Sequence, residues 1–240
     1  MMVHIHFEPK DRQTFQFRKT TNKLASFLIK NNEYLRPFVH FLRDSHAYDA
    51  NKFHQTIRRY QERVSRKRVR SGFDEEYVSL LDELSTVCHK DSDVNDLRGM
   101  IAEQIFQECF RKKKLGRDWL CSTGCSVWID GIVVIYKAGD ESKMTVDLGA
   151  WCFNLQSGKF YEVKLSPYAF HPLDFGYLAL LHDSLRDAGV SLYEIGIFSL
   201  DNAHLLQNRI QQLGYKLLPQ MHILSLDDFL KNESISCHRA

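Results

Sequence analysis

The sequence predicts an α/β protein with two differently patterned regions. Apolar residues recur at roughly helical spacing within residues 1–90, whereas later apolar segments are short and bounded by polar turns, with many Val, Ile and Trp around residues 126–136. The 240 residues are enough for one large domain or for a compact domain with an appendage. These observations indicate a mixed α/β fold with a helical N-terminal region.

The N-terminal region, residues 1–90, is expected to be helical. Residues 27–42 show the helical apolar period, and Pro37 marks a helix start or a kink. Two more helices are predicted over residues 50–69 and 74–87. A helical appendage suggests docking or regulation, so we expect a protein partner to bind there.

Residues 91–240 are expected to form a second domain, in which strands and helices alternate. A long helix comes first, and its basic C-terminal end suits the helix dipole. Polar turns then separate three strands, and a glycine ends the next helix. The order is helix, three strands, helix, strand, then helix, strand, helix, over residues 91–114, 126–136, 143–153, 159–165, 173–188, 192–199, 202–213, 215–224 and 227–231.

Positive charge is concentrated in residues 52–70, which hold eight basic residues against one acid, Glu62. The whole chain has a formal net charge of only +2, but nucleic-acid binding depends on local surface charge. This segment could follow a phosphate backbone, or it could be a solvated helix face or contact an acidic partner. The candidate nucleic-acid contacts are Arg58, Arg59, Arg63, Arg66, Lys67 and Arg70.

A cytoplasmic location is expected. No apolar run approaches the ~18 residues that span a bilayer, and the N-terminus is charged where a signal peptide is apolar. The six cysteines are expected to be free thiols in a reducing compartment. Cys121 and Cys125 are spaced like a zinc turn, but there is no second close pair, and structural zinc usually needs four ligands.

The pattern Glu-x-Lys occurs three times, and its context separates the three copies. The copy at residues 8–10 contains proline, and the copy at residues 141–143 lies in a predicted turn. Only Glu162-Val163-Lys164 lies inside an apolar strand. This third copy is therefore the one that a folded sheet could use for chemistry.

Strand periodicity brings a second acid to this motif. Side chains two residues apart share a face, so Glu162 and Lys164 point the same way, and Asp147 shares a face with Thr145 and Gly149 in the preceding strand. A hairpin between these strands places Asp147 beside Glu162. Two neighbouring carboxylates repel each other unless a cation is present, and oxygen ligands suit magnesium or manganese. The alternative is a simple salt bridge with Lys164.

These residues, in this order, resemble the PD-(D/E)XK (restriction endonuclease-like) nuclease superfamily. The resemblance covers residues 91–200: a helix with Gly-Met-Ile-Ala-Glu ending at Glu103, then Asp147, then Glu162-x-Lys164, then a helix and a strand. It implies an αβββαβ core. Val146 stands where the family's name-giving proline would be, and Asp130 competes with Asp147 for the place of the acid.

The resemblance implies a magnesium-dependent endonuclease that hydrolyses phosphodiester bonds, with DNA favoured over RNA. Asp147 and Glu162 would hold Mg²⁺ or Mn²⁺ together with the Val163 carbonyl, and Glu103 would bind directly or through water, unless it is an exposed glutamate. Lys164 would orient or activate the attacking water. Three residues after the third strand could line the phosphate path, although a loop and a helix cap is the preferred interpretation: His171, Asp174 and Tyr177.

Other functions compete with this one. The chain could be a non-catalytic nucleic-acid-binding or assembly subunit with a nuclease fold, because a fold does not prove an activity. A GNAT-type acetyltransferase is less favoured, because no pyrophosphate-binding glycine loop is found. By analogy, a small nuclease with a docking region suggests a subunit of a bacterial defence or restriction-like system.

Overall fold

The computed structural model describes residues 2–10, 15–66, 73–112, 118–215, 217–218 and 221–236. The chain divides into a helical unit, Arg12–Cys109, and a sheet unit, Met1–Asp11 with Phe110–Ala240. This division differs from the predicted boundary at residue 90. The long predicted helix at residues 91–114 lies mostly in the helical unit, and the first residues of the chain belong to the sheet.

The helical unit is built from amphipathic helices around an aromatic core. Phe38, Phe53 and Leu81 are fully buried, and the rings of Phe27 and Tyr77 stack with their centroids 5.3 Å apart. Pro37 lies inside a helix that begins before it. The helices predicted over residues 50–69, 74–87 and 91–114 are confirmed within the described residues, whereas the helical period of residues 27–42 is divided between two helices. The elements are α1 (Phe15–Lys30), α2 (Asn32–Asp44), η1 (Ser45–Ala47), α3 (Ala50–Arg66), α4 (Phe73–Val87) and α5 (Asp91–Lys112).

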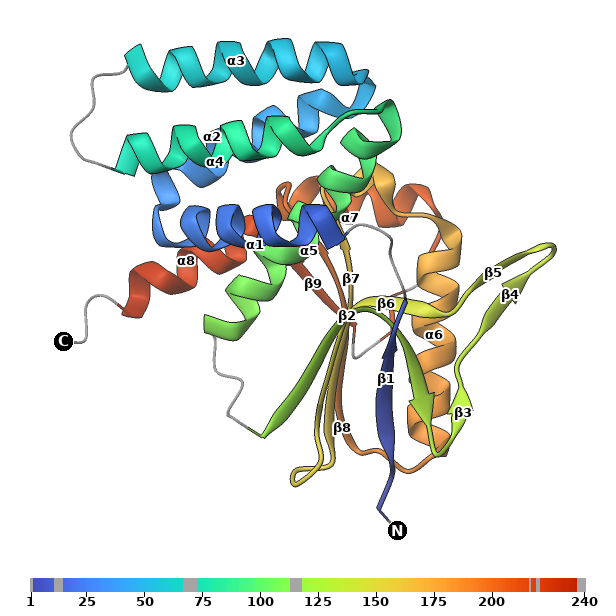
Figure 1. Cartoon of the computed structure of the whole chain (residues 1–240). Coiled ribbons are helices and arrows are strands. Elements are labelled where there is room, and N and C mark those ends of the chain that lie inside the picture. The colour runs from blue at the N-terminus through green and yellow to red at the C-terminus, as the bar shows by residue number, and fades with distance from the viewer. Residues whose placement is uncertain are drawn as a thin grey trace. The chain divides into compact units, whose positions relative to one another are not determined.

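The sheet unit has a mixed sheet, in which three antiparallel pairings are followed by two parallel ones. Its order is β1-β2-β6-β7-β8-β9, with β3 paired to β2 (Figure 1). The strands are β1 (Ile5–Pro9), β2 (Trp119–Ile129), β3 (Ile132–Val133), β6 (Thr145–Cys152), β7 (Ser157–Lys164), β8 (Leu192–Ser199) and β9 (Met221–Ser225). The β7–β8 and β8–β9 pairs are parallel. A separate hairpin joins β4 (Tyr136–Ala138) to β5 (Glu141–Lys143).

The expectation that residues 1–90 are helical throughout is wrong at the start. Residues 5–9 form β1, which pairs antiparallel with β2 from Ile5↔Ile129 to Pro9↔Cys125. Ile5 is buried while His6 is exposed and stacks on Trp128. The strand is short, and its partner lies more than a hundred residues away, so local periodicity does not reveal the pairing.

Three helices complete the sheet unit: α6 (Pro172–Asp187), α7 (Ala203–Gln212) and α8 (Leu226–Ser236). Helix α6 connects β7 to the parallel strand β8, and its Leu178 and Leu181 pack in one core with Phe160 of β7 (Figure 1). A helix of this kind is the usual connection between neighbouring parallel strands. The mixed α/β class is confirmed.

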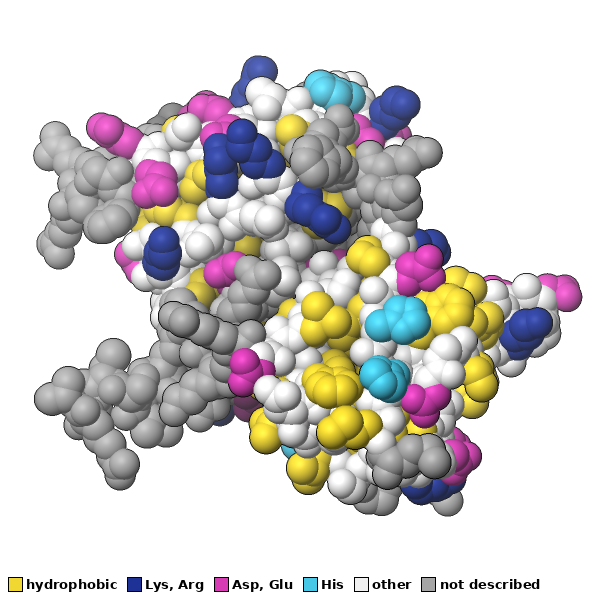
Figure 2. All heavy atoms as spheres, turned by 60° about the horizontal axis from the view of Figure 1, so that its bottom comes forward, with side chains coloured by type: hydrophobic (Ala, Val, Ile, Leu, Met, Phe, Trp, Pro, Cys, Tyr) yellow, Lys and Arg dark blue, Asp and Glu magenta, His cyan; other side chains and the backbone are white. Residues whose placement is uncertain are grey.

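The two ends of β7 differ in character. Phe153 and Leu155, in the turn before β7, are exposed, as is Leu192 at the start of β8. Figure 2 shows a face of the molecule on which hydrophobic side chains gather. Glu162 and Lys164 lie at the other end of β7, where Lys164 ends the strand. The predicted chemistry therefore belongs to the end of the sheet where β7 and β8 finish.

The expectations about membrane-spanning segments and cysteines concern the whole chain. No helix in the described ranges is long and apolar enough to cross a membrane. The cysteines in those ranges form no disulfide and carry thiols, as predicted: Cys88, Cys109, Cys121, Cys125 and Cys152. Cys237 lies outside the described residues.

Candidate active site

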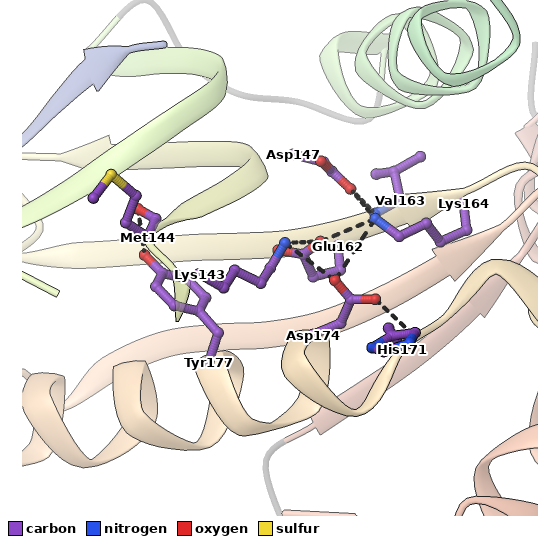
Figure 3. Close-up of polar contacts among 9 residues, drawn as sticks. All are labelled: Lys143, Met144, Asp147, Glu162, Val163, Lys164, His171, Asp174 and Tyr177. Atoms are coloured by element: carbon purple, nitrogen blue, oxygen red, sulfur yellow. Dashed lines mark hydrogen bonds and ion pairs between the residues drawn. The ribbon is translucent and has the colours of Figure 1, made fainter. Parts of the chain in front are cut away.

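The hairpin of β6 and β7 brings the predicted acids together. Its antiparallel register includes Leu148↔Tyr161, and one further step places Asp147 opposite Glu162. Side chains of opposed residues project from the same face of a sheet. Glu162 is fully buried and Asp147 nearly so, on the face that α6 covers (Figure 3).

Lys164 and the backbone of β7 hold the Asp147 carboxylate. The Lys164 ammonium nitrogen (Nζ) lies 3.0 Å from Asp147 Oδ2 and 3.2 Å from Glu162 Oε2. The Val163 amide also donates to Asp147 Oδ2, at 2.8 Å. The predicted grouping of Asp147, Glu162 and Lys164 is therefore present, with ion pairs among its members.

Two further residues complete the cluster. Lys143 Nζ lies 3.1 Å from Glu162 Oε2 and 3.1 Å from Asp174 Oδ1, and Lys164 is 3.9 Å from the same Asp174 oxygen (Figure 3). Lys143 was predicted to begin the strand at residues 143–153, but its Glu-x-Lys copy was set aside as part of the preceding turn, and a cap role was preferred for Asp174. The missed signal was periodicity, because Lys143 is four residues before Asp147 and shares its strand face.

Asp174 has two partners at once. Its Oδ2 accepts a hydrogen bond from the His171 amide at 2.8 Å, which caps α6, while Oδ1 faces the lysines. The predicted helix cap is thus confirmed, and the same carboxylate is also part of the charged cluster. His171 itself is exposed. Tyr177 is buried, and its hydroxyl donates to the Met144 carbonyl at 3.3 Å.

The cluster has more negative than positive charge. Burial, followed by the nearby Asp147 charge, raises the pKa of Glu162 well above its ordinary value. Burial also raises the pKa of Asp147, but Lys164, Lys143 and the Val163 amide outweigh it and leave that pKa lowered. Burial lowers the pKa of Lys164, but the three carboxylates outweigh it and raise that pKa well above its ordinary value. Glu162 is therefore the acid that most needs a further positive partner.

The other oxygen of Glu162 supports the same conclusion. Oε1 is buried and has no hydrogen-bond partner among the described residues. A carboxylate oxygen in this state costs free energy unless a donor or a cation reaches it. Among the same residues, however, no three acidic, histidine or cysteine side chains form a group that could hold a metal as they stand. The ammonium groups of Lys143 and Lys164 lie between the carboxylates instead.

Asp130, the competing acid, has a structural role. It lies in the turn between β2 and β3 with a φ of 49° and an exposed side chain. Its Oδ1 accepts a hydrogen bond from the His4 amide at 2.8 Å, which ties the start of β1 to the end of β2. This placement favours Asp147 as the acid of the site.

The remaining predicted site residues lie in the helical unit. Glu103 is on α5 and only 8% exposed, so the alternative of an exposed glutamate is wrong. Its participation in the site stays a prediction. Arg58, Arg59 and Arg63 are exposed on α3. The side chain of Arg66 lies outside the described residues, as do Lys67 and Arg70, and nucleic-acid binding by this segment also stays a prediction.

Comparison with known proteins adds little to this site. No protein-family model matches the sequence, and no curated protein does. Among solved structures, the chain is similar to protein VC1899 from Vibrio cholerae at 14% sequence identity and a TM-score of 0.45. That match covers 98% of this chain and 57% of the other. A likeness this weak supports no conclusion about fold or function, and the site rests on its own geometry.

Proposed function

We propose that the sheet unit is a metal-dependent nuclease that hydrolyses phosphodiester bonds, with Asp147, Glu162 and Lys164 at its centre. The observation that carries the proposal is the Glu162 carboxylate. It is fully buried opposite Asp147, and its Oε1 has no hydrogen-bond partner among the described residues. Because this arrangement is unfavourable without a cation, the donor set fits a hard divalent ion such as Mg²⁺ or Mn²⁺.

Charge balance supports the same ion. The carboxylates of Asp147, Glu162 and Asp174, with the ammonium groups of Lys143 and Lys164, leave one formal negative charge. A divalent cation would turn this into one positive charge, which a single phosphodiester group would neutralise. Asp147 and Glu162 would hold the ion, with the Val163 carbonyl as a further ligand. When bound, such an ion makes water a better nucleophile and neutralises charge on the phosphate.

Lys164 acts as a hydrogen-bond donor in this proposal. Its contact with Asp147 keeps it charged, so it orients water or stabilises negative charge on a phosphate oxygen, and it does not remove a proton. Asp147, held by the Val163 amide, positions Lys164 and would be a ligand of the cation when one is bound.

The order of elements also supports the nuclease assignment. With the short strands β3, β4 and β5 between β2 and β6 set aside, α5, β2, β6, β7, α6 and β8 follow the αβββαβ order that the PD-(D/E)XK resemblance implies, and β7 and β8 are parallel. From the same resemblance, DNA is the first substrate to test, and the helical unit is the proposed docking region of a defence or restriction-like complex.

The test is an assay with the full chain on single- and double-stranded DNA and RNA. We expect cleavage with Mg²⁺ or Mn²⁺, no cleavage with a chelator, and none by a folded Asp147→Asn variant. Cleavage that persists in the chelator would contradict the metal requirement. A protein that binds the cation but cuts none of the four polymers would contradict the nuclease proposal.

A further inference from the structure

The β4–β5 hairpin brings Lys143 to the site from outside the main sheet. Lys143 is the last residue of β5 and pairs with Tyr136 at the start of β4. Only Met144 separates Lys143 from β6. The hairpin therefore sets the position of an ammonium group directly beside the β6–β7 acids.

Helix α6 fixes the hairpin in place on both sides of this lysine. Tyr136 packs so closely on Gly176 that a Cβ there would come within 2.3 Å of the tyrosine ring. The Tyr177 hydroxyl donates to the Met144 carbonyl at 3.3 Å, and Asp174 of the same helix accepts the ion pair from Lys143. These contacts make Lys143 a positioned part of the cluster rather than a surface lysine.

The two lysines are the most solvent-exposed members of the cluster. Their side chains are 16% exposed for Lys143 and 21% for Lys164, against 0% for Glu162 and 7–8% for Asp174 and Asp147. An anion that arrives from solvent therefore reaches the lysine side chains more readily than the carboxylates.

We propose that Lys143 is a second phosphate-binding lysine, which neutralises Glu162 in the cation-free protein and moves to a phosphate oxygen when a divalent cation takes its place. This inference rests on the proposed nuclease function. Asp174 makes the exchange possible, because it keeps an ion pair with Lys143 after Glu162 is taken by the cation. Asp174 is thus a positioning residue.

The exchange has a consequence that a merely structural lysine would lack. Lys143 and the cation compete for the same Glu162 oxygen, so removing the ammonium should strengthen cation binding and weaken cleavage. Removing a lysine with only a structural role would weaken both cation binding and cleavage, or neither of them. The two measurements therefore separate the roles.

The experiment compares Lys143→Met, which keeps length and removes charge, with Lys143→Arg and with Lys137→Met as matched control. Lys137 is exposed on β4 of the same hairpin. Calorimetry with Mn²⁺ alone measures binding without nucleic acid. Lys143→Met removes the ammonium group that competes with the cation for Glu162. We therefore expect this variant to bind Mn²⁺ about tenfold more tightly than the wild type. Cleavage of the polymer that the wild type cuts should fall about 10²-fold, as for loss of a positioned charge donor. Lys143→Arg should recover part of the rate, and Lys137→Met should match the wild type.

Each outcome decides between the two proposals. If the wild type binds Mn²⁺ and cleaves, but Lys143→Met changes neither property, the inference about Lys143 is overturned and the nuclease proposal stands. If Lys143→Met weakens both while remaining folded, Lys143 supports the site without exchanging, and the inference is again overturned. If the wild type neither binds Mn²⁺ nor cleaves, both proposals fail.

Discussion

Replacing Glu162 with glutamine should stabilise the metal-free protein at neutral pH, although it removes a residue with two ion pairs. The substitution keeps the shape and removes the charge. Afterwards Lys143 still pairs with Asp174, and Lys164 still pairs with Asp147. The cluster then contains two positive and two negative groups, and none is left alone.

The magnitude follows from opposing contributions. The contacts from Glu162 to Lys143 and Lys164, at 3.1 and 3.2 Å, contribute about 5 kcal/mol each at an effective dielectric constant near 20. Burial of the carboxylate costs several kcal/mol, and repulsion from Asp147 and Asp174 opposes the attraction further. The raised pKa of Glu162 shows that the unfavourable contributions win. We expect a gain of about 2 kcal/mol, or roughly 4–8 °C in Tm for a protein of this size.

The sign of the pH dependence follows from the same pKa. Because the pKa of Glu162 is raised in the folded protein, its contribution to stability is fully present below its unfolded pKa and is lost as pH rises through the folded value. Glu162→Gln does not show this loss, so its advantage over the wild type should grow with pH. Thermal unfolding in chelator between pH 5 and pH 8 measures the difference.

Glu194→Gln provides the control of opposite sign. Glu194 is partly buried, which raises its pKa, but Lys159 and Tyr161 outweigh burial and lower it. Its charge is therefore stabilising above its unfolded pKa, and Glu194→Gln should lower Tm at pH 8. A Glu162→Gln protein that melts below the wild type at pH 8 in chelator would show that the buried charge is stabilising, contrary to this expectation. Added Mg²⁺ at about 100 times its Kd should stabilise the wild type by about 2.7 kcal/mol and the variant much less.

Three other predictions concern the site and its substrate. Lys164→Ala should reduce cleavage by about 10²–10³-fold with an unchanged circular dichroism spectrum, because it removes a charge donor from the phosphate; normal rates in the folded variant would exclude Lys164. Asp147→Asn should lose Mn²⁺ binding in calorimetry while Asp130→Asn keeps it, and the reverse order would transfer the ligand role to Asp130. Reversing Arg59 and Arg63 to glutamate should weaken nucleic-acid binding. It should also make the slope of log K against log[salt] shallower, by the amount expected for the loss of about one to two phosphate contacts. An unchanged slope would mean that this face is solvated or binds a protein partner.

The sequence predicted the centre of the candidate site because strand periodicity is strict there. Asp147, Glu162 and Lys164 lie in strands whose alternation and turn spacing determine which residues share a face. The hairpin between the two strands then determines their register. In the structure, Asp147 lies opposite Glu162, as expected, one step beyond the Leu148↔Tyr161 pair. Local pattern was sufficient because the two strands are neighbours in sequence.

Residues brought by nonlocal contacts were not predicted. Lys143 lies at the end of a short hairpin whose position depends on Tyr136 packing against Gly176, a contact between segments forty residues apart. Asp174 was assigned to a helix cap because that role is visible in sequence, whereas its ion pair with Lys143 depends on where α6 packs. Five residues of β1 were placed in a helical region because their partner strand is remote.

The distance between β1 and its partner also bears on synthesis. Glu8 and Trp128, which are hydrogen-bonded in the folded sheet, are 120 residues apart. At ~5–20 residues per second, a ribosome needs about 6–24 s to make that stretch. During this interval the contacts of the helical unit, which are closer in sequence, can form while the partner strand of β1 is still incomplete. β1 therefore cannot join the sheet until β2 has been made, well after its own synthesis.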